Sequence, residues 1–277
     1  MNKIYVIFIM GLKIGIIGLP NVGKSTIFNS LTKSAIPAEN YPFCTIDPNV
    51  GIVAVPDNRL NNIAHIYNPK LITPATVEFV DIAGLVQGAN KGEGLGNQFL
   101  SHIRDVNAII HVVRAFKEDN IAHVEGNLNP IRDIEIIETE LLIRDMASVE
   151  KRIDKLQKNA RVGDKNSNEE LAVLDYIYPI MNEGVMVYDM SLDSNQRNPL
   201  RLLSLLTNKP TLYVVNIDED EMSSNEQSQT IQQLFFLLKN VGTVRSGSAV
   251  DWRKKFQLWM KKKSFFIWKN IILLSLD

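Results

Sequence analysis

The segment GLPNVGKST, residues 18 to 26, constrains this chain more than any other stretch of its sequence. It fits the pattern G-x-x-x-x-G-K-[ST], follows the apolar run LKIGIIG, and opens a segment with helical spacing, KSTIFNSLTKS. A strand, a glycine-containing turn and a helix are the context that a phosphate-binding loop requires. The glycines let backbone N–H groups wrap a phosphate, and the start of the helix adds its positive end. The segment therefore predicts a nucleoside triphosphate site.

The side chains of this loop have separate parts in holding a triphosphate. Lys24 places a point charge near the β- and γ-phosphate oxygens, which makes it a candidate catalytic residue, and the Ser25 hydroxyl is a ligand for Mg²⁺. We expect the nucleotide to be bound by six consecutive residues: Asn21, Val22, Gly23, Lys24, Ser25 and Thr26.

Two further segments supply the rest of the predicted phosphate and metal site. VEFVDIAG ends a strand with Asp81 and Gly84 in the arrangement D-x-x-G. Asp81 would hold Mg²⁺ through a water molecule, and the Gly84 N–H would sense the γ-phosphate. Thr45 lies in the loop YPFCTIDPNVG before a strand and is a candidate second ligand. The predicted metal ligands are thus Ser25, Thr45 and Asp81, and Gly84 joins the catalytic candidates.

The residue after D-x-x-G is Leu85, where Ras-like GTPases carry a glutamine that orients the attacking water. A leucine side chain neither donates nor accepts a hydrogen bond, so another group must position the water. His102 and His123 are candidates, because histidine has an unperturbed pKa near neutrality.

Several apolar runs predict the fold class. Near-continuous runs separated by helical or loop segments favour a mostly parallel α/β sheet with helices on both faces. Ligands bind such sheets at the carboxyl ends of the strands. Besides the run before the loop, the strand candidates are GIVAV (51–55), ATVEFVDI (75–82), AIIHVVRAF (108–116) and PTLYVVN (210–216).

Residues 129–207 interrupt this pattern with helical periodicity. Apolar residues spaced three and four apart form a heptad-like seam, which predicts two antiparallel helices joined by a polar loop. The pattern leaves open whether the pair projects as an arm or packs on the sheet domain. The predicted nucleotide-binding domain therefore comprises residues 10–128 and 208–250. The seam residues are Leu142, Met146, Val149, Ile153 and Leu156, then Leu171, Leu174, Tyr178 and Met181.

Composition restricts the partners and the compartment. The formal net charge of −1 gives the chain no overall attraction for nucleic acid or an anionic membrane, so we expect neither DNA binding nor stable membrane association. The single cysteine, Cys44, excludes an intramolecular disulfide and fits a reducing cytoplasm. We interpret residues 1–9 as an extension upstream of the natural start.

Residues 251–277 differ from the rest, because they contain all three tryptophans and a cluster of lysines. The segment FQLWMKKKSFFIWKNIILLSLD has two interpretations. It is a basic amphipathic helix that touches a membrane or an RNA surface, or it is the end of a truncated or frame-shifted gene. We favour the second and set these residues apart as an aberrant tail.

Four segments together resemble the Obg-like ATPases, the YchF family of translation-factor-class P-loop proteins. The match runs from Met10 to about Met222, and the glycine-rich part is highly specific. Relatives continue into a small C-terminal TGS domain, which we do not find after Met222. The matching segments are MGLKIGIIGLPNVGKST, YPFCTIDPNVG, VEFVDIAGLVQGANKGEGLGNQFLSHIR and NIDED.

The resemblance implies a Ras-like nucleotide domain interrupted by a helical hairpin, with ATP as the nucleotide and the ribosome as a partner. It also implies an apolar residue in place of the catalytic glutamine, as at Leu85. DNIAHVEG matches a family segment whose histidine is a proposed water-positioning group, which favours His123. Asn21 is similar to an asparagine that coordinates K⁺ in some relatives, so K⁺ is a second candidate ion beside Mg²⁺.

The nucleotide base is predicted from NIDED, which stands where many GTPases read Asn-Lys-x-Asp. A guanine-specific aspartate accepts hydrogen bonds from N1–H and the 2-amino group, and adenine offers neither donor. Glu219 moves the carboxylate by about one methylene and removes that fork. Asn216 can still bond the base, and the chain at Ile217 can lie against the ring. We therefore expect ATP in preference to GTP.

The sequence is compatible with three functions. The first is an ATPase switch whose hydrolysis changes its affinity for the translation machinery, slow unless a partner completes the site. The second is an Obg-type GTPase, against which the N-x-x-E segment argues. The third is a nucleotide-binding remnant without useful hydrolysis, which Leu85 and the tail keep open.

Overall fold

The computed structural model describes most of the sheet domain and of the helical insertion, together with the backbone of two short strands near the C-terminus. The described residues are 11–32, 49–82, 103–116, 128–161, 163–217 and 232–234, with backbone alone at 266–268 and 271–274.

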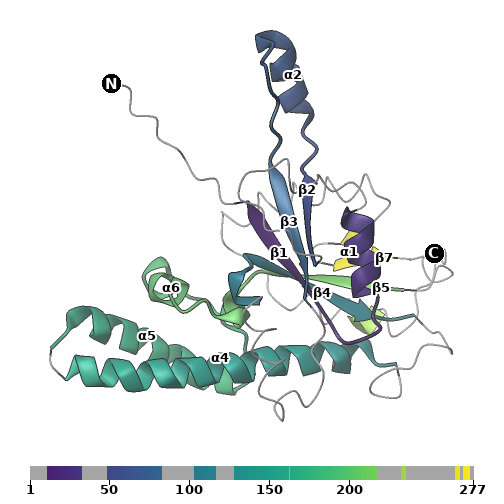
Figure 1. Cartoon of the computed structure of the whole chain (residues 1–277). Helices are drawn as coiled ribbons and strands as arrows, with labels where there is room; N and C mark the ends of the chain where they lie inside the picture. The colour runs from purple at the N-terminus through teal and green to yellow at the C-terminus, as the bar shows by residue number, and fades with distance from the viewer. Residues whose placement is uncertain are drawn as a thin grey trace, which may run out of the picture.

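A seven-stranded sheet forms the centre of the described fold, in the order β2-β3-β1-β4-β5-β7-β6 (Figure 1). β3, β1, β4, β5 and β7 run parallel as neighbours, whereas β2 and β6 pair antiparallel at the two edges. The predicted mostly parallel sheet is confirmed. The strands are β1 (Leu12–Ile17), β2 (Val50–Ala54), β3 (Thr76–Asp81), β4 (Ala108–Arg114), β5 (Thr211–Asn216), β6 (Phe266–Trp268) and β7 (Ile271–Leu274).

The described part of the tail is strand rather than helix. β7 extends the sheet beside β5, with Tyr213 opposite Ile271, and β6 pairs back onto β7. The run IILL is apolar and partly β-branched, which suits a strand next to another strand better than a solvated helix. The amphipathic-helix interpretation is therefore wrong for these residues, and the rest of residues 251–277 lies outside the described part.

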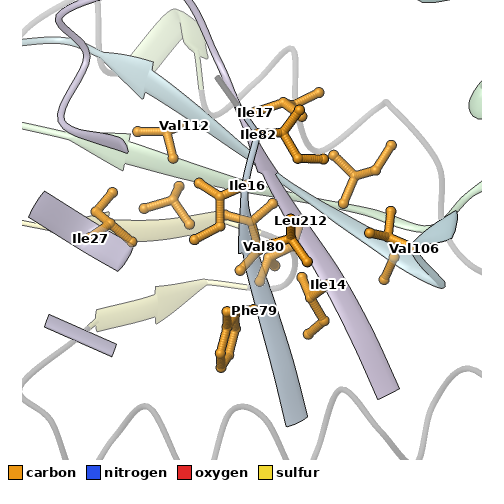
Figure 2. Close-up of a cluster of buried hydrophobic side chains, with 14 of the residues drawn as sticks. Ile14, Ile16, Ile17, Ile27, Phe79, Val80, Ile82, Val106, Val112 and Leu212 are labelled. Carbon is orange, nitrogen blue, oxygen red and sulfur yellow. The ribbon is translucent and has the colours of Figure 1, made fainter. Parts of the chain in front are cut away.

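The core packs between the sheet and α1 (Lys24–Thr32), and Figure 2 shows some of its buried side chains. α1 buries Ile27, Phe28 and Leu31 in the same cluster as Ile16 and Val80 of the sheet. Burial of an aliphatic or aromatic side chain of this size contributes about 1.5 to 3 kcal/mol. The end of β1 and the start of α1 are thereby held in a fixed relation.

A short helix, α2 (Asn58–Tyr67), connects β2 to β3 and stands away from the sheet (Figure 1). The Asp57 carboxylate caps its start by accepting a hydrogen bond from the Arg59 backbone N–H, and Asn68 ends it in the left-handed conformation at φ 43°. None of its residues is buried, so the apolar side chains of Ile66 and Tyr67 lie at the surface.

Two long antiparallel helices, α4 (Pro130–Ala160) and α5 (Lys165–Asn182), form an arm that projects from the sheet domain (Figure 1). The predicted hairpin is confirmed. Asn129 and Asp164 cap the two helix starts through their side chains. The Arg152 guanidinium bridges to Glu170 through two hydrogen bonds of 2.7 Å each. The seam residues Leu142, Val149, Leu156, Leu174 and Met181 are buried, with Met146, Ile153, Leu171 and Tyr178 packed against them.

Short elements return the chain from the arm to β5, namely η3 (Val187–Asp189), α6 (Ser194–Arg201) and η4 (Leu206–Asn208). The buried Asp145 carboxylate on α4 accepts hydrogen bonds from the Leu206 N–H and from the N–H and hydroxyl of Thr207. Lys209 then donates to the carbonyls of Arg104 and Val106 beside the sheet. These contacts fix the root of the arm. Within the described residues, no helix has both the length and the apolar character to cross a membrane.

Candidate functional site

The predicted phosphate loop lies where β1 passes into α1, at the carboxyl end of a central strand. Gly18 lies so close to β4 that a Cβ atom there would come within 2.4 Å of the Val112 carbonyl oxygen. Gly23 and Asn21 have positive φ angles of 98° and 61°. Positive φ turns the chain sharply and directs its N–H groups into the loop. Residues 21–26 therefore lie in a sharply turned segment at the start of α1, and their contact with a nucleotide stays a prediction.

Lys24, the first residue of α1, is partly buried against its own loop. Its Nζ donates to the Leu19 carbonyl oxygen over 2.7 Å. Burial lowers the pKa of the Lys24 ammonium, and the nearby Asp81 carboxylate opposes this shift. The charged form of a desolvated lysine at the start of a helix is stabilised by a bound anion, because the anion replaces the electrostatic interactions with water that burial removed.

The metal-ligand candidates Ser25 and Asp81 meet across the site. The Ser25 hydroxyl in the first turn of α1 donates to Asp81 Oδ2 at the end of β3 over 2.9 Å. A hydroxyl and a carboxylate are oxygen ligands of the kind that Mg²⁺ prefers. These two residues, 56 positions apart in the chain, therefore fit a Mg²⁺ ion beside a triphosphate.

Of the base-reading candidates, Asn216 is the last residue of β5 and Ile217 follows it, next to the same loop. The Asn216 side-chain amide donates to the Val22 carbonyl oxygen over 3.2 Å, and the residue is 4% exposed. Ile217 is 3% exposed and packs in a cluster with Val113 and Val215. The sequence predicts a base contact for Asn216, whereas in the described structure its amide nitrogen supports the phosphate loop.

A buried histidine lies beneath the site and was not among the predicted residues. His111 on β4 is 2% exposed, and its ring lies 5.4 Å from that of Tyr213 on β5. Burial, together with the smaller effect of the Lys24 charge, lowers the pKa of His111 to about 3, so the imidazole is neutral at physiological pH. The Tyr213 hydroxyl donates in turn to Glu138 on α4. His111 interrupts the otherwise apolar run AIIHVV, and this is the sequence signal that marks the position.

Several predicted site residues lie outside the described part of the chain. Their placement relative to the loop is not addressed by the structure, and their parts stay predictions. They are Thr45, Gly84, Leu85, His102, His123 and Glu219.

The loop, the helix that it opens and the largely parallel sheet define a P-loop α/β fold of the GTPase type. Comparison with protein families agrees, because the family described as "50S ribosome-binding GTPase" matches residues 13–143.

Known relatives make the assignment more specific. The ribosome-binding ATPase YchF of Haemophilus ducreyi is 51% identical over 225 residues, which are 81% of this chain and 62% of that protein. The protein of the same name from Bacillus subtilis is 49% identical over 225 residues, with the same coverage. The solved structure of the Schizosaccharomyces pombe YchF GTPase matches with a TM-score of 0.70 at 34% identity, over 95% of this chain and 79% of that one. This chain belongs to the YchF family, and it spans about 62% of the length of those curated relatives.

Proposed function

We propose that this chain binds ATP with Mg²⁺, hydrolyses it in preference to GTP, and acts as a nucleotide-controlled switch that associates with the ribosome. The observation that carries the proposal is the hydrogen bond of 2.9 Å between Ser25 and Asp81 beside the partly buried Lys24. A positive charge, a helix start and two oxygen ligands for a divalent cation converge there.

The chain's own residues would divide the chemistry as follows. The backbone N–H groups of the loop hold the β-phosphate, and Lys24 leaves the Leu19 carbonyl to reach the phosphate oxygens. Ser25 and Thr45 would ligate Mg²⁺ directly, and Asp81 would hold it through water. When bound, Mg²⁺ neutralises charge on the β- and γ-phosphates. Asn21 within the loop is the residue that would coordinate K⁺.

Water attack needs a positioning group, because Leu85 cannot orient water. We assign this part to His123, with the Gly84 N–H reporting the presence of the γ-phosphate. Hydrolysis is then slow until a partner completes the site, as in other switches of this class.

Adenine preference rests on the residues around Asn216. Glu219 replaces the aspartate that would accept hydrogen bonds from N1–H and the 2-amino group of guanine. Guanine would therefore lose this pair of hydrogen bonds. The printed names of the relatives differ here, since the bacterial proteins are called ATPases and the fission yeast protein a GTPase. The base is therefore the first property to measure.

Competition binding tests the nucleotide proposal directly. Fluorescent ATP and GTP analogues with Mg²⁺ would be bound to the purified chain and displaced by unlabelled ATP, GTP or ADP. We expect ATP to displace the probes at lower concentration than GTP. Preference for GTP would reject the base assignment and favour the Obg-type GTPase, and binding of neither nucleotide would reject the site.

Turnover separates a switch from a binding remnant. Phosphate release from ATP is expected for the unchanged chain, and Ser25→Ala should lower it at limiting Mg²⁺ by about a hundredfold or more. His123→Ala should lower turnover without weakening ATP binding. ATP binding with no phosphate release from the unchanged chain would favour the remnant.

The relatives' printed names, which describe ribosome-binding proteins, support the ribosome as the proposed partner and a cytoplasmic compartment. We assign this chain to the cytoplasm on that basis. We also propose residues 10–128 and 208–250 as the nucleotide domain and residues 129–207 as a separate helical unit. Co-sedimentation with purified ribosomal subunits, with and without ATP, tests the partner.

A further inference from the structure

A hydrogen bond joins the arm to the central sheet: the Tyr213 hydroxyl on β5 donates to Oε1 of Glu138 on α4. The bond lies where the arm begins, because Tyr213 packs in one buried cluster with Ile134 of α4. About two turns further along α4, the Asp145 carboxylate accepts hydrogen bonds from two backbone N–H groups of η4. α4 is therefore bonded both to β5 itself and to the short helix that precedes β5.

The Glu138 carboxylate depends on this tyrosine. Burial raises the pKa of the Glu138 carboxyl, and the hydrogen bond from Tyr213 opposes that rise. The negative charges of Asp189 and Glu135 raise the same pKa further. A buried carboxylate whose donor is removed retains the cost of its desolvation. The position of Glu138, and with it the start of α4, therefore depends on the Tyr213 hydroxyl.

Tyr213 is also linked to the phosphate loop through β4 and β5. His111 lies opposite Tyr213 in the register of these strands, and the two ring centroids are 5.4 Å apart. The next residue of β4, Val112, carries the carbonyl oxygen that Gly18 of the loop approaches closely. At the end of β5, Asn216 donates to a carbonyl oxygen of the loop over 3.2 Å. A displacement of either strand would therefore move the loop, since packed strands transmit shifts as rigid elements.

The loop in turn places Lys24. The Lys24 ammonium donates to the Leu19 carbonyl oxygen, so the backbone of the loop holds the charge in the described structure. The same charge contributes to the low pKa of His111, and thus acts on the pair of rings beneath the loop. From Glu138 on α4 to Lys24 at the loop, the arm and the phosphate site are joined by a continuous series of interactions.

We propose that Tyr213 is a positioning residue for the phosphate loop, which anchors the ends of β4 and β5 to Glu138 of the arm. The inference rests on the proposed ATPase function and adds a residue that acts through the loop. A loop supported in this way keeps its N–H groups and Lys24 in place as charge develops on the phosphates. Misplacement of such groups by about 1 Å costs up to about a hundredfold in rate. A displacement of α4 that breaks the bond would release the strands that support the loop.

Hydrogen exchange of the full chain without nucleotide is the first measurement. Tyr213→Phe removes only the hydroxyl and keeps the ring beside His111. The α1 amides, including that of Ile27, which donates to the Gly23 carbonyl over 3.0 Å, should exchange about tenfold faster in this variant. The amides of β3, on the far side of β1, report global stability and should change by less than about twofold. Glu138→Ala removes the acceptor instead of the donor and should reproduce this result.

Two matched variants separate the loss of this bond from a general effect of the substitutions. Tyr178→Phe removes a hydroxyl that donates to Glu150 within the arm, so it breaks the same kind of bond away from the sheet and should leave α1 exchange unchanged. Glu138→Gln keeps an oxygen that accepts from the Tyr213 hydroxyl and should exchange like the unchanged chain. Equal acceleration of α1 and β3 in Tyr213→Phe would overturn the proposal. So would equal α1 exchange in Tyr213→Phe and Tyr178→Phe.

Phosphate release from ATP by the same preparations measures the effect on the reaction. We expect kcat to be about three- to tenfold lower in Tyr213→Phe and Glu138→Ala, and unchanged in Glu138→Gln and Tyr178→Phe. An unchanged rate in Tyr213→Phe would overturn the positioning role. If the unchanged chain releases no phosphate while its α1 exchange depends on Tyr213, only the proposed ATPase function is rejected. Phosphate release with α1 exchange independent of Tyr213 would reject only the anchoring of the loop.

Discussion

The Asn216 side-chain amide donates a hydrogen bond to the Val22 carbonyl oxygen, 194 positions earlier in the chain. The end of β5 is thereby tied to the phosphate loop, inside a part of the molecule from which water is largely excluded. A residue whose sequence context indicates base recognition thus also supports the loop that would hold the phosphates.

Asn216→Ala should weaken the binding of ATP, GTP and ADP by similar factors, because the loop loses its support whichever base is bound. Loss of one buried hydrogen bond costs about 1 to 3 kcal/mol, so we expect roughly a five- to hundredfold fall in affinity. Calorimetric titration with the three nucleotides measures it, with the exposed Asn182→Ala as the control. Weaker ATP binding with unchanged GTP binding would instead assign Asn216 to the base alone.

Gly18→Ala should destabilise the sheet domain, because the new Cβ would lie 2.4 Å from the fixed carbonyl oxygen of Val112. Overpacking of this kind typically costs about 1 to 3 kcal/mol. Gly184→Ala is the comparison, since Gly184 also has a positive φ, 89°, but no atom of the described residues lies within 4 Å of its Cβ position. Urea unfolding should show the larger loss for Gly18→Ala, and equal losses would assign the effect to backbone strain alone.

His111 should make the fold less stable as the pH falls. Burial and the Lys24 charge hold its folded-state pKa at about 3, whereas an unfolded histidine titrates near 6.5. Between these values the unfolded chain binds the extra proton, so stability is lost by about 1.4 kcal/mol for each pH unit below about 6.5. Chemical unfolding of His111→Gln from pH 7 to pH 5 should show a flatter dependence, and parallel curves would contradict the assignment.

Asp145→Ala should loosen the root of the arm. It leaves the N–H groups of Leu206 and Thr207 without their acceptor in a buried place, at a cost of about 2 to 4 kcal/mol. Thr207→Val removes only the hydroxyl contact to Asp145 and should cost about 1 kcal/mol. Hydrogen exchange of the α4 amides measures both, and similar exchange in the two variants would show that the backbone bonds contribute little.

The phosphate loop and the arm could be predicted because their signals are local. The segment GLPNVGKST contains the glycines, Lys24 and Ser25 within nine residues, so a single short stretch identifies the phosphate-binding turn. The two helices of the arm are likewise predicted by apolar residues three and four apart, which face the same side of any helix that contains them. In the tail, the local composition suggested a helix, whereas the run IILL forms a strand that pairs with β5.

The sequence by itself therefore determined the strand–loop–helix unit and the two amphipathic helices, whose signals lie in residues a few positions apart, and the structure shows that the helix pair projects as an arm. Only the tertiary structure decided that Ser25 meets Asp81, that Asn216 supports Val22, and that His111 lies neutral beneath the loop. The physical reason is that these relations depend on strand order and on burial. Both arise when distant strands pair side by side and exclude water, and neither is encoded in the spacing of neighbouring residues.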